Sequence, residues 1–196
     1  VIADKVNAVY GLDIWKPGKW ARVGSWGSTC VLTVHNRFSG YVFLLPLKDG
    51  KSETVTRELV KNVFLSHSVP RTIITDGGPE FSGLFSRMVQ YYGIDHRRTT
   101  RWYPCSNGAT ERAHKFLRQY FRSYLEHTYD LTKWDRFLAC AQAAWNGAKS
   151  RRHGFSPYFL MHGREPHRPI DNLIRRDADM SKAGLSMVSQ PVEIAK

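Results

Sequence analysis

The most informative ten residues of this chain are TIITDGGPEF, Thr72–Phe81. Their opening run of β-branched residues predicts a short, buried β-strand. Asp76 follows that strand at once, and Gly77 and Gly78 place no side chain next to its carboxylate. Asp-Gly pairs are also common in ordinary turns, so a structural turn aspartate is the alternative interpretation. These residues raise the question of whether Asp76 holds a ligand at the end of its strand.

Strand and helix patterns alternate on both sides of this segment. Alternating and β-branched runs predict strands, and apolar residues at helical spacing predict helices. The sequence predicts strands at 6–15, 28–36, 40–47, 71–75 and 94–98, and helices at 52–66, 83–92, 109–127 and 132–150. The strands on either side of the turn at 37–40 form a hairpin, so the sheet is not purely parallel. Together these elements predict an α/β fold in which helices flank a mixed sheet.

The composition limits the class of partner. The chain has 196 residues, enough for one sizeable core and short for two full domains. Lys and Arg number 29 against 17 Asp and Glu, which gives a net charge of +12 and a sequence pI near 9.8. This excess favours a polyanionic partner, nucleic acid above all, although basic chains also bind acidic membranes or use their charge to stay in solution.

Cysteine spacing and hydropathy limit the cellular compartments and the partners that can be expected for this chain. Cys30, Cys105 and Cys140 show no pairing pattern, which favours a reducing, intracellular compartment over a disulfide framework or a cysteine zinc site. The longest uncharged apolar run, Tyr41–Leu47, is too short to cross a bilayer, so no membrane partner is expected. The chain begins with Val1 rather than Met, which favours a piece of a longer polypeptide.

Three carboxylates stand where an acid needs a partner or a chemical task. Asp13 interrupts an apolar strand, Asp76 ends a strand, and Glu111 is expected in the first turn of the long helix. Each has a structural explanation, because a strand residue can face solvent, an Asp-Gly pair can form a turn, and an acid suits a helix N-terminus. For any one of these acids, the structural explanation is at least as good as a functional one.

The three acids are more informative together. Strand ends and helix starts meet at one rim of an α/β sheet, so the three carboxylates can converge. Carboxylates held close together repel unless a cation lies between them. Oxygen ligands without a Cys or His cluster select Mg²⁺ or Mn²⁺ rather than zinc. Two such ions would activate a nucleophile and stabilise a leaving oxygen on phosphorus.

The predicted helix at 109–127 carries its charges on one side. Glu111, Lys115, Arg118 and Arg122 recur at helical spacing, so they share a face. The opposite face is apolar and contains Ala113, Leu117, Tyr120 and Tyr124. Further arginines lie nearby in the sequence at Arg97, Arg98, Arg101 and Arg112. An acid followed by cations suits chemistry on a DNA strand, whereas a merely solvated face would more often mix the two signs.

These residues resemble the catalytic core of a retroviral-type integrase, nearest to those of gypsy-class long-terminal-repeat retrotransposons. The resemblance covers roughly 8–171 and rests on the order and spacing of several stretches. They are GLDIW, VLTVHNRFSGYVFLLPLKD, VPRTIITDGGPEF, YYGIDHRRTTRWYPCSNGATERAHKFLR, WDRFLACAQAAWN and HGFSPYFLMHGREPHRPID. We therefore expect a catalytic core over 1–174 and a polar tail or linker over 175–196.

The resemblance implies an RNase H-like fold with a mixed five-stranded sheet and a catalytic triad at Asp13, Asp76 and Glu111. Members of this family hold two Mg²⁺ or Mn²⁺ ions on the triad. They trim the 3′ ends of the element's DNA with water and then use the new 3′-OH to attack target DNA. This in-line displacement relies on positioning and charge neutralisation rather than on a covalent enzyme intermediate.

The resemblance also implies where DNA is held. Asn107 and Gly108 match the family's active-site loop, and Lys115 and Arg118 match positions that grip the DNA end. Trp102 and Tyr103 lie where a side chain meets the terminal bases and could stack on them. Arg122 continues the cationic face by one turn.

Two departures from the family are visible. Thirty-four residues separate Asp76 from Glu111, one fewer than is usual in the family, and the missing residue falls before Pro104. The family's zinc-binding and C-terminal modules have no counterpart in these 196 residues.

The family works as multimers on DNA. We therefore expect element-end and target DNA as partners and a homo-oligomer built on a core dimer through the helices at 52–66 and 132–150. Trp134, Phe137 and Trp145 can serve that interface or the internal core, and core packing is the simpler interpretation. The expected location is the nucleus, with a cytoplasmic particle stage. Two other functions remain open, a non-catalytic DNA-binding protein derived from an integrase and an RNase H-like nuclease.

Overall fold

A computed structural model describes residues 3–18, 23–99, 108–128, 132–150, 153–168 and 171–172; within the long helix, the side chains of 108–111 and 124–128 are not described. The chain divides into two compact units, residues 1–165 and 166–196. The sheet and the helices around it belong to the first unit. The predicted boundary at 174, between a catalytic core and a polar tail, stays a prediction. Among the described residues, no helix is both long and apolar enough to cross a membrane.

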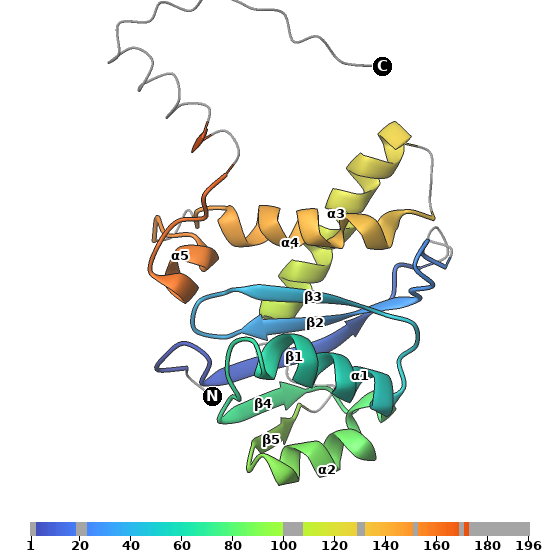
Figure 1. The fold of residues 1–196 in the computed structure, drawn as a ribbon, viewed down its shortest axis with the longest axis vertical. Coiled ribbons are helices and arrows are strands. Elements are labelled where there is room, and N and C mark those ends of the chain that lie inside the picture. The colour runs from blue at the N-terminus through green and yellow to red at the C-terminus, as the bar shows by residue number, and fades with distance from the viewer. Residues whose placement is uncertain are drawn as a thin grey trace, which may run out of the picture. The chain divides into compact units, whose positions relative to one another are not determined.

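Five strands form one mixed sheet (Figure 1). They are β1 Val9–Trp15, β2 Cys30–Asn36, β3 Val42–Leu47, β4 Thr72–Thr75 and β5 Asp95–Arg98. Their order across the sheet is β3-β2-β1-β4-β5. β1 pairs antiparallel with β2 and parallel with β4, so the first strand of the chain lies at the centre of the sheet. The predicted mixed sheet flanked by helices is confirmed.

The hairpin between β2 and β3 turns where the sequence predicts. Asn36 Oδ1 accepts hydrogen bonds from the backbone N–H groups of Phe38 and Ser39, both at 3.1 Å. Gly40 has a φ of 74°, a left-handed conformation that favours glycine. These local bonds fix the turn and, with it, the register of the two strands.

One face of the sheet is covered by α1 Ser52–Leu59 and α2 Leu84–Tyr91, with the short 3₁₀ turn η2 Pro79–Phe81 between β4 and α2. Tyr10, Leu12 and Ile73 point from the strands into this core and pack in one cluster of buried aliphatic and aromatic side chains. The helix predicted at 52–66 forms, but it continues beyond Leu59 as a π-helix, η1 Val60–Phe64. That irregular last stretch has no periodicity of its own that a sequence pattern could reveal.

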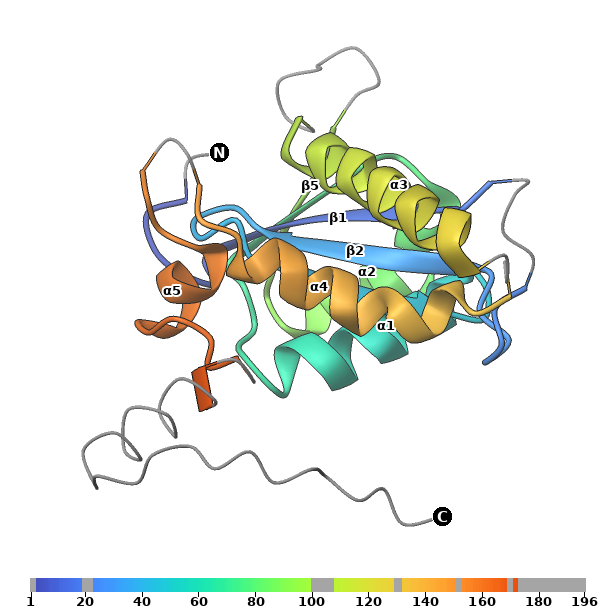
Figure 2. The same cartoon turned by 90° about the horizontal axis from the view of Figure 1, so that it is seen from above.

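The opposite face is covered by α3 Gly108–Thr128, with η4 Trp134–Phe137 and α4 Leu138–Gly147 following it. Figure 2 shows α3 and α1 on opposite sides of β1 and β2. Trp15 stacks on Phe121 at a centroid distance of 5.8 Å and meets Trp134 edge to face at 6.5 Å. Trp134 is fully buried, and Phe137 and Trp145 are partly buried against the same cluster, so the core interpretation of these aromatics is confirmed.

The helix predicted at 132–150 differs from the structure at both ends. It starts as a 3₁₀ turn and ends at Gly147. α4 also runs along the outer edge of β3 (Figure 1), where Gln142 Oε1 and Asn146 Oδ1 accept the N–H groups of Leu44 and Val42 at 2.7 and 2.9 Å. These side-chain bonds satisfy backbone groups that an edge strand otherwise leaves open for pairing.

A further short helix, α5 Pro157–His162, lies in the aromatic segment that the sequence leaves without a predicted element. Ser156 caps it, since its side chain accepts the N–H of Phe159 at 2.9 Å, and Pro157 occupies the first turn. The Ser-Pro pair is the signal that identifies this start.

Candidate functional site

The strand register indicates how Asp13 and Asp76 are placed relative to each other. In the parallel pair of β1 and β4, Gly11 lies opposite Ile74. Asp13 comes two residues after Gly11 within β1, and Asp76 comes two residues after Ile74, one residue past the end of β4. Continuing the register by two residues predicts that the two acids lie opposite each other on one face, because side chains alternate along a strand and registered partners point the same way. The convergence of these two site residues is an extension of the register and stays a prediction.

Asp13 lies in the middle of β1 on the face covered by α3, with its side chain 21% exposed. His114 from α3 lies beside it, with its Nδ1 3.8 Å from Asp13 Oδ2. That separation is too long for a hydrogen bond. The Nε2 atom of His114 lies 3.3 Å from Thr33 Oγ1 on the neighbouring strand.

His114 is uncharged at neutral pH. Burial, helped by the positive charge of Arg118, lowers the pKa of its imidazole to about 4. The group beside Asp13 is therefore a neutral imidazole and adds no positive charge there.

Asp76 follows β4 directly and is half-buried. Its Oδ1 accepts the backbone N–H of Gly78 at 3.2 Å, which is the hydrogen bond of an Asx turn. Gly77 and Gly78 both have ordinary negative φ angles, so neither glycine is required by the backbone conformation. A Cβ at Gly77 would have no atom within 4 Å, whereas one at Gly78 would meet the Glu80 carboxylate at 2.6 Å. Gly77 therefore faces open space beside Asp76.

Glu111 lies in the first turn of α3, three positions before His114. Residues three apart share a side of a helix, so the backbone of Glu111 lies one turn from the residue that faces Asp13. The side chain of Glu111 is outside the described residues. Among the side chains that are described, no group of three or more His, Cys, Asp or Glu is close enough to hold a metal ion. The carboxylates of Asp13 and Asp76 are donors of the oxygen type that suits Mg²⁺ or Mn²⁺.

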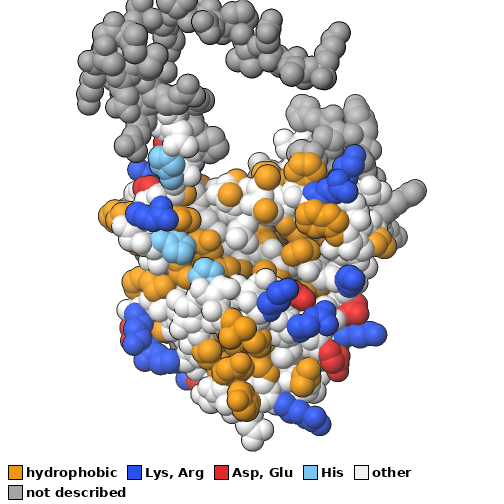
Figure 3. Space-filling model, in the orientation of Figure 1, with side chains coloured by type: hydrophobic (Ala, Val, Ile, Leu, Met, Phe, Trp, Pro, Cys, Tyr) orange, Lys and Arg blue, Asp and Glu red, His pale blue; other side chains and the backbone are white. Residues whose placement is uncertain are grey.

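The predicted DNA-contacting residues divide into two groups. Lys115, Arg118 and Arg122 are exposed along α3, as the helical spacing predicts. Arg101, Trp102, Tyr103 and Asn107 lie outside the described residues, and Gly108 is described only as the first residue of α3. Figure 3 shows further Lys and Arg side chains over one face of the molecule, several of them beside acids. Elsewhere in the described structure, Arg97 pairs with Asp95, with Arg97 Nε 2.7 Å from Asp95 Oδ2.

The apolar side of α3 is slightly different from the prediction. Ala113 and Leu117 are buried as expected, and Phe121 is fully buried beside them. The sequence pattern places Tyr120 on this stripe, but Tyr120 is only partly buried at its margin. The difference is one residue of helical phase, about 100°.

A buried acid that sequence reasoning missed is Asp135. It is 1% exposed, and its two oxygens accept hydrogen bonds from Ser25 N, Ser25 Oγ and Trp26 N at 3.1, 3.1 and 2.9 Å. Gly24 packs so closely that an added Cβ would lie 2.2 Å from Asp135 Oδ2. All of this carboxylate's described bonds go to one loop, so Asp135 has a structural role.

A pocket that contains two arginines was also missed. Its lining includes His35 and Arg37 from the hairpin, Arg112 and Phe116 from α3, and Trp145 from α4. No motif in the sequence connects these segments, because the pocket exists only once the hairpin and two helices are folded together.

Comparison with known sequences finds relatives among polyproteins of mobile elements and viruses. The chain is 27% identical over 144 residues to the retrovirus-related Pol polyprotein from transposon 412 of Drosophila melanogaster, covering 73% of the chain and 12% of that polyprotein. It is 28% identical over 161 residues to the Pol polyprotein of Radiation murine leukemia virus (strain Kaplan), covering 81% of the chain and 26% of that polyprotein. The chain thus spans only about an eighth of the first relative's length and about a quarter of the second's. No family model matches the chain.

Comparison with solved structures identifies the fold. A chain in the cryo-EM structure of the simian T-cell lymphotropic virus intasome with PP2A regulatory subunit B56 gamma aligns with a TM-score of 0.71 and 20% identity over 86% of this chain and 61% of that one. The HTLV-2 integrase catalytic core domain in complex with magnesium aligns with a TM-score of 0.65 and 21% identity over 82% of this chain and 99% of that one. The predicted RNase H-like fold and the resemblance to retroviral-type integrase cores are confirmed.

Proposed function

We propose that this chain, a relative of retroviral and retrotransposon Pol polyproteins with the fold of an integrase core, catalyses metal-dependent 3′-end processing and strand transfer of retroelement DNA. The observation that carries the proposal is the β1–β4 register, in which Gly11 lies opposite Ile74; extended by two residues, it supports a site at Asp13 and Asp76 on the face that α3 covers. Glu111 in the first turn of that helix completes the set. The match to transposon 412 supports an origin in a gypsy-class element.

Asp13, Asp76 and Glu111 are the residues that would hold Mg²⁺ or Mn²⁺, two ions in each active site. Bound ions would supply charge neutralisation and an activated nucleophile for in-line displacement at phosphorus. His114 is compatible with this role because burial lowers the pKa of its imidazole to about 4, so His114 itself adds no positive charge beside Asp13. The solved HTLV-2 core in complex with magnesium gives independent support.

DNA would be held by the exposed cations of α3. Lys115, Arg118 and Arg122 lie on one side of the helix that begins at the candidate site, so they can follow a phosphate backbone leading away from it. We propose element ends and target DNA as the ligands and a homo-oligomer, with a core dimer inside a larger multimer, as the working form. The intasome and the dimeric and trimeric forms of the HTLV-2 core support association of this kind. Such a reaction would take place in the nucleus, after a cytoplasmic particle stage.

The experiment that tests the proposal combines two substrates. The purified chain is incubated with a panel of labelled, pre-trimmed duplex ends plus a target plasmid, and separately with branched substrates that report the reverse, disintegration reaction. Each reaction is run with Mn²⁺ and with EDTA. Glu111→Gln is compared with Glu53→Gln, which changes an exposed acid in the first turn of α1. We expect metal-dependent joining or resolution that Glu111→Gln loses and Glu53→Gln keeps.

Two other outcomes would select the competing functions. A folded chain that binds DNA in a salt-dependent way but forms no product on either substrate would be a DNA-binding protein derived from an integrase. Hydrolysis of RNA in RNA–DNA hybrids without any joining would identify a nuclease on the same fold.

A further inference from the structure

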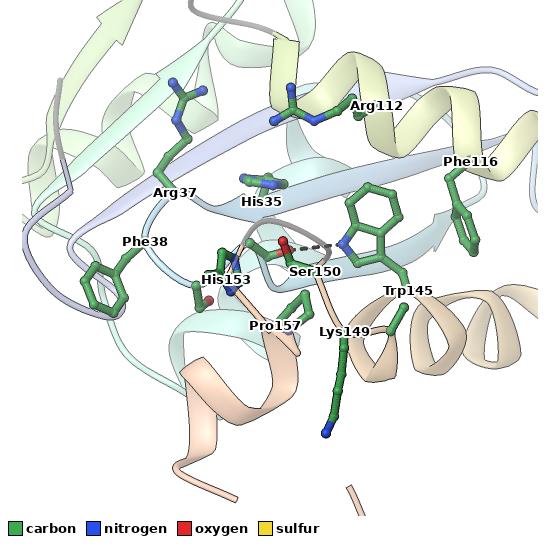
Figure 4. Close-up of a pocket in the computed structure, with 13 residues that line it drawn as sticks. His35, Arg37, Phe38, Arg112, Phe116, Trp145, Lys149, Ser150, His153 and Pro157 are labelled. Atoms are coloured by element: carbon green, nitrogen blue, oxygen red, sulfur yellow. Dashed lines mark hydrogen bonds between the residues drawn. The ribbon is translucent and has the colours of Figure 1, made fainter. Parts of the chain in front are cut away.

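A pocket of about 840 Å³ lies where the β2–β3 hairpin meets α3 and the end of α4 (Figure 4). His35 forms its floor, Arg37 and Arg112 stand above it, and Phe116 and Trp145 make one wall. All of these residues belong to the unit 1–165. None of the residues described as lining the pocket is acidic.

Arg37 and Arg112 concentrate positive charge in this pocket. Figure 4 shows both side chains above the His35 ring, with Arg37 to its left and Arg112 to its right. Burial and the charge of Arg112 lower the pKa of Arg37, which reports that the two cations are close enough to oppose each other. Lys149 also lines the pocket, but its Nζ lies 3.9 Å from Glu165 Oε1 and its side chain points away from the arginines.

His35 is buried close to the positive charges of Arg37 and Arg112, and a bound anion would offset those charges. His35 is 6% exposed, and its Nδ1 is buried without a hydrogen-bond partner in the described structure. Burial first, and then the charges of Arg37 and Arg112, lower its pKa to about 4. A negative charge between the arginines would offset the repulsion between them and the positive potential at the imidazole.

The aromatic wall adds a second type of contact. Phe116 and Trp145 meet edge to face at a centroid distance of 5.2 Å. The indole is held in place because its Nε1 donates to the Gly40 carbonyl at 3.1 Å, the dashed line in Figure 4. A fixed aromatic surface beside two guanidinium groups suits a ligand with a phosphate and an unstacked base.

The pocket adjoins the candidate active site. His35 lies two residues from Thr33 on β2, and Thr33 pairs in register with Asp13. Arg112 directly follows Glu111 on α3. A ligand in the pocket would thus lie beside the proposed acids while contacting different residues.

We propose that this pocket binds one nucleotide of an unpaired DNA strand, with its phosphate between Arg37 and Arg112 and its base and sugar against Trp145 and Phe116. The proposal rests on the proposed function for the identity of the polymer, and on the pocket alone for the phosphate and aromatic chemistry. An unpaired strand is favoured over a duplex because stacking on the indole requires a base face that a duplex covers.

Binding is tested on the full chain without metal, so no catalytic step is involved. His35 is followed by NMR, with its signals assigned by comparison with His35→Asn, while a single-stranded hexanucleotide, a blunt duplex of the same sequence, or inorganic phosphate is added. We expect the hexanucleotide to raise the pKa of His35 at lower concentrations than the duplex, and phosphate to do so only weakly. Arg37→Gln and Arg112→Gln should each weaken hexanucleotide binding roughly three- to tenfold and reduce the salt dependence by about one phosphate contact.

Arg87→Gln, a change of an exposed arginine on α2, is the matched control and should leave binding unchanged. The proposal is overturned if adding the hexanucleotide does not change the pKa of His35, or if neither pocket variant changes the salt dependence of hexanucleotide binding. It is also overturned if phosphate or the duplex binds as well as the single strand. Because Asp13, Asp76 and Glu111 are intact and no turnover is measured, this result is independent of the joining assay. Loss of joining with nucleotide binding retained would overturn the proposed function alone.

Discussion

The two faces of the sheet are built for different purposes, and two neighbouring residues of β1 show the difference. Leu12 points into the core beneath α1 and α2, where its neighbours are aliphatic and aromatic side chains. Asp13 points to the face under α3, where Thr33 and His114 surround it. On that second face the apolar cluster of Trp15, Phe121 and Trp134 fills only one part of the interface.

The comparison teaches how the fold separates stability from chemistry. A sheet with one largely apolar face has enough buried surface to hold the strands in place, so the other face can carry more polar groups. The acids, the neutral histidine and the basic pocket all lie on this second face. Substitutions on the two faces should therefore have different effects.

The largest expected effect is on catalysis and comes from Asp13→Asn. The change removes a charge while keeping the size of the side chain, so metal binding should be lost and the fold kept. We expect the disintegration rate to fall by roughly a thousandfold or more, equivalent to about 4 kcal/mol in the barrier. The midpoint temperature of thermal unfolding of the variant should stay within a few degrees of that of the unchanged chain. A variant that kept its activity would show that the two faces are not divided in this way.

Leu12→Ala, one residue earlier, should do the opposite. Leu12 is 2% exposed in the apolar core, and truncating a buried leucine typically costs about 2–5 kcal/mol of the free energy of unfolding. Chemical denaturation measures this cost, and Leu65→Ala, at a leucine that is 76% exposed, is the control with an expected change below about 0.5 kcal/mol. A cost as small as the control's would contradict the assignment of this face to stability.

A smaller effect should appear as the pH falls, and it belongs to the polar face. The pKa of His35 is lowered from its ordinary 6.5 to about 4, so the unfolded chain binds the proton more readily than the folded chain does. His35 therefore favours folding fully above pH 6.5, and this advantage is lost as the pH falls from about 6.5 toward 4. By pH 5 the free energy of unfolding should have dropped by about 2 kcal/mol on account of this group.

Urea denaturation at pH 7 and pH 5 measures this drop. His35→Asn should reduce it, whereas the change His167→Gln at an exposed histidine should not. His114 titrates in the same direction, so part of the drop should remain in His35→Asn. An identical drop with and without His35 would show that this imidazole is not held neutral by burial.

The smallest expected effect is on the apolar face. Thr56 on α1 is 7% exposed, and its hydroxyl is buried without a hydrogen-bond partner in the described structure. Thr56→Val replaces that hydroxyl with a methyl group of similar size, so it should leave stability unchanged or raise it by up to about 1 kcal/mol. The denaturation midpoint should rise without a change in slope. A clear loss of stability would mean that this face also depends on a polar contact.

The strands and most helices could be predicted because their sequence periods match their burial. β2 is buried at every position, and the hairpin carries its own turn signal in Asn36 and Gly40. Asp13 and Asp76 can be recognised as candidates from the sequence. Asp13 interrupts the apolar pattern of β1, and Asp76 directly follows the apolar residues of β4. Their alignment could only be expected in general terms, since it depends on a register between strands that are far apart in the sequence.

The rest depends on contacts that no local pattern records. Asp135 looks like any helical acid in the sequence, and only the folded chain shows that it binds the loop at Ser25 and Trp26. Likewise, Arg37 and Arg112 become neighbours of His35 through the packing of α3 against the hairpin. Long-range contacts of this kind decide which polar groups act together.

The central position of β1 has a consequence for how the chain reaches this structure. β1 precedes the other strands in the chain, and β2 can join it early. Its other neighbour is β4, which pairs Thr72 with Val9 across a long intervening segment. Contacts between residues so distant in the chain form slowly. The chain loses conformational entropy when the intervening segment closes, before the favourable strand contacts have formed. We therefore expect the hairpin sheet of β1, β2 and β3 to assemble before β4 docks. The two acids would then be aligned in one of the last steps of folding, so an incompletely made chain carries no assembled site.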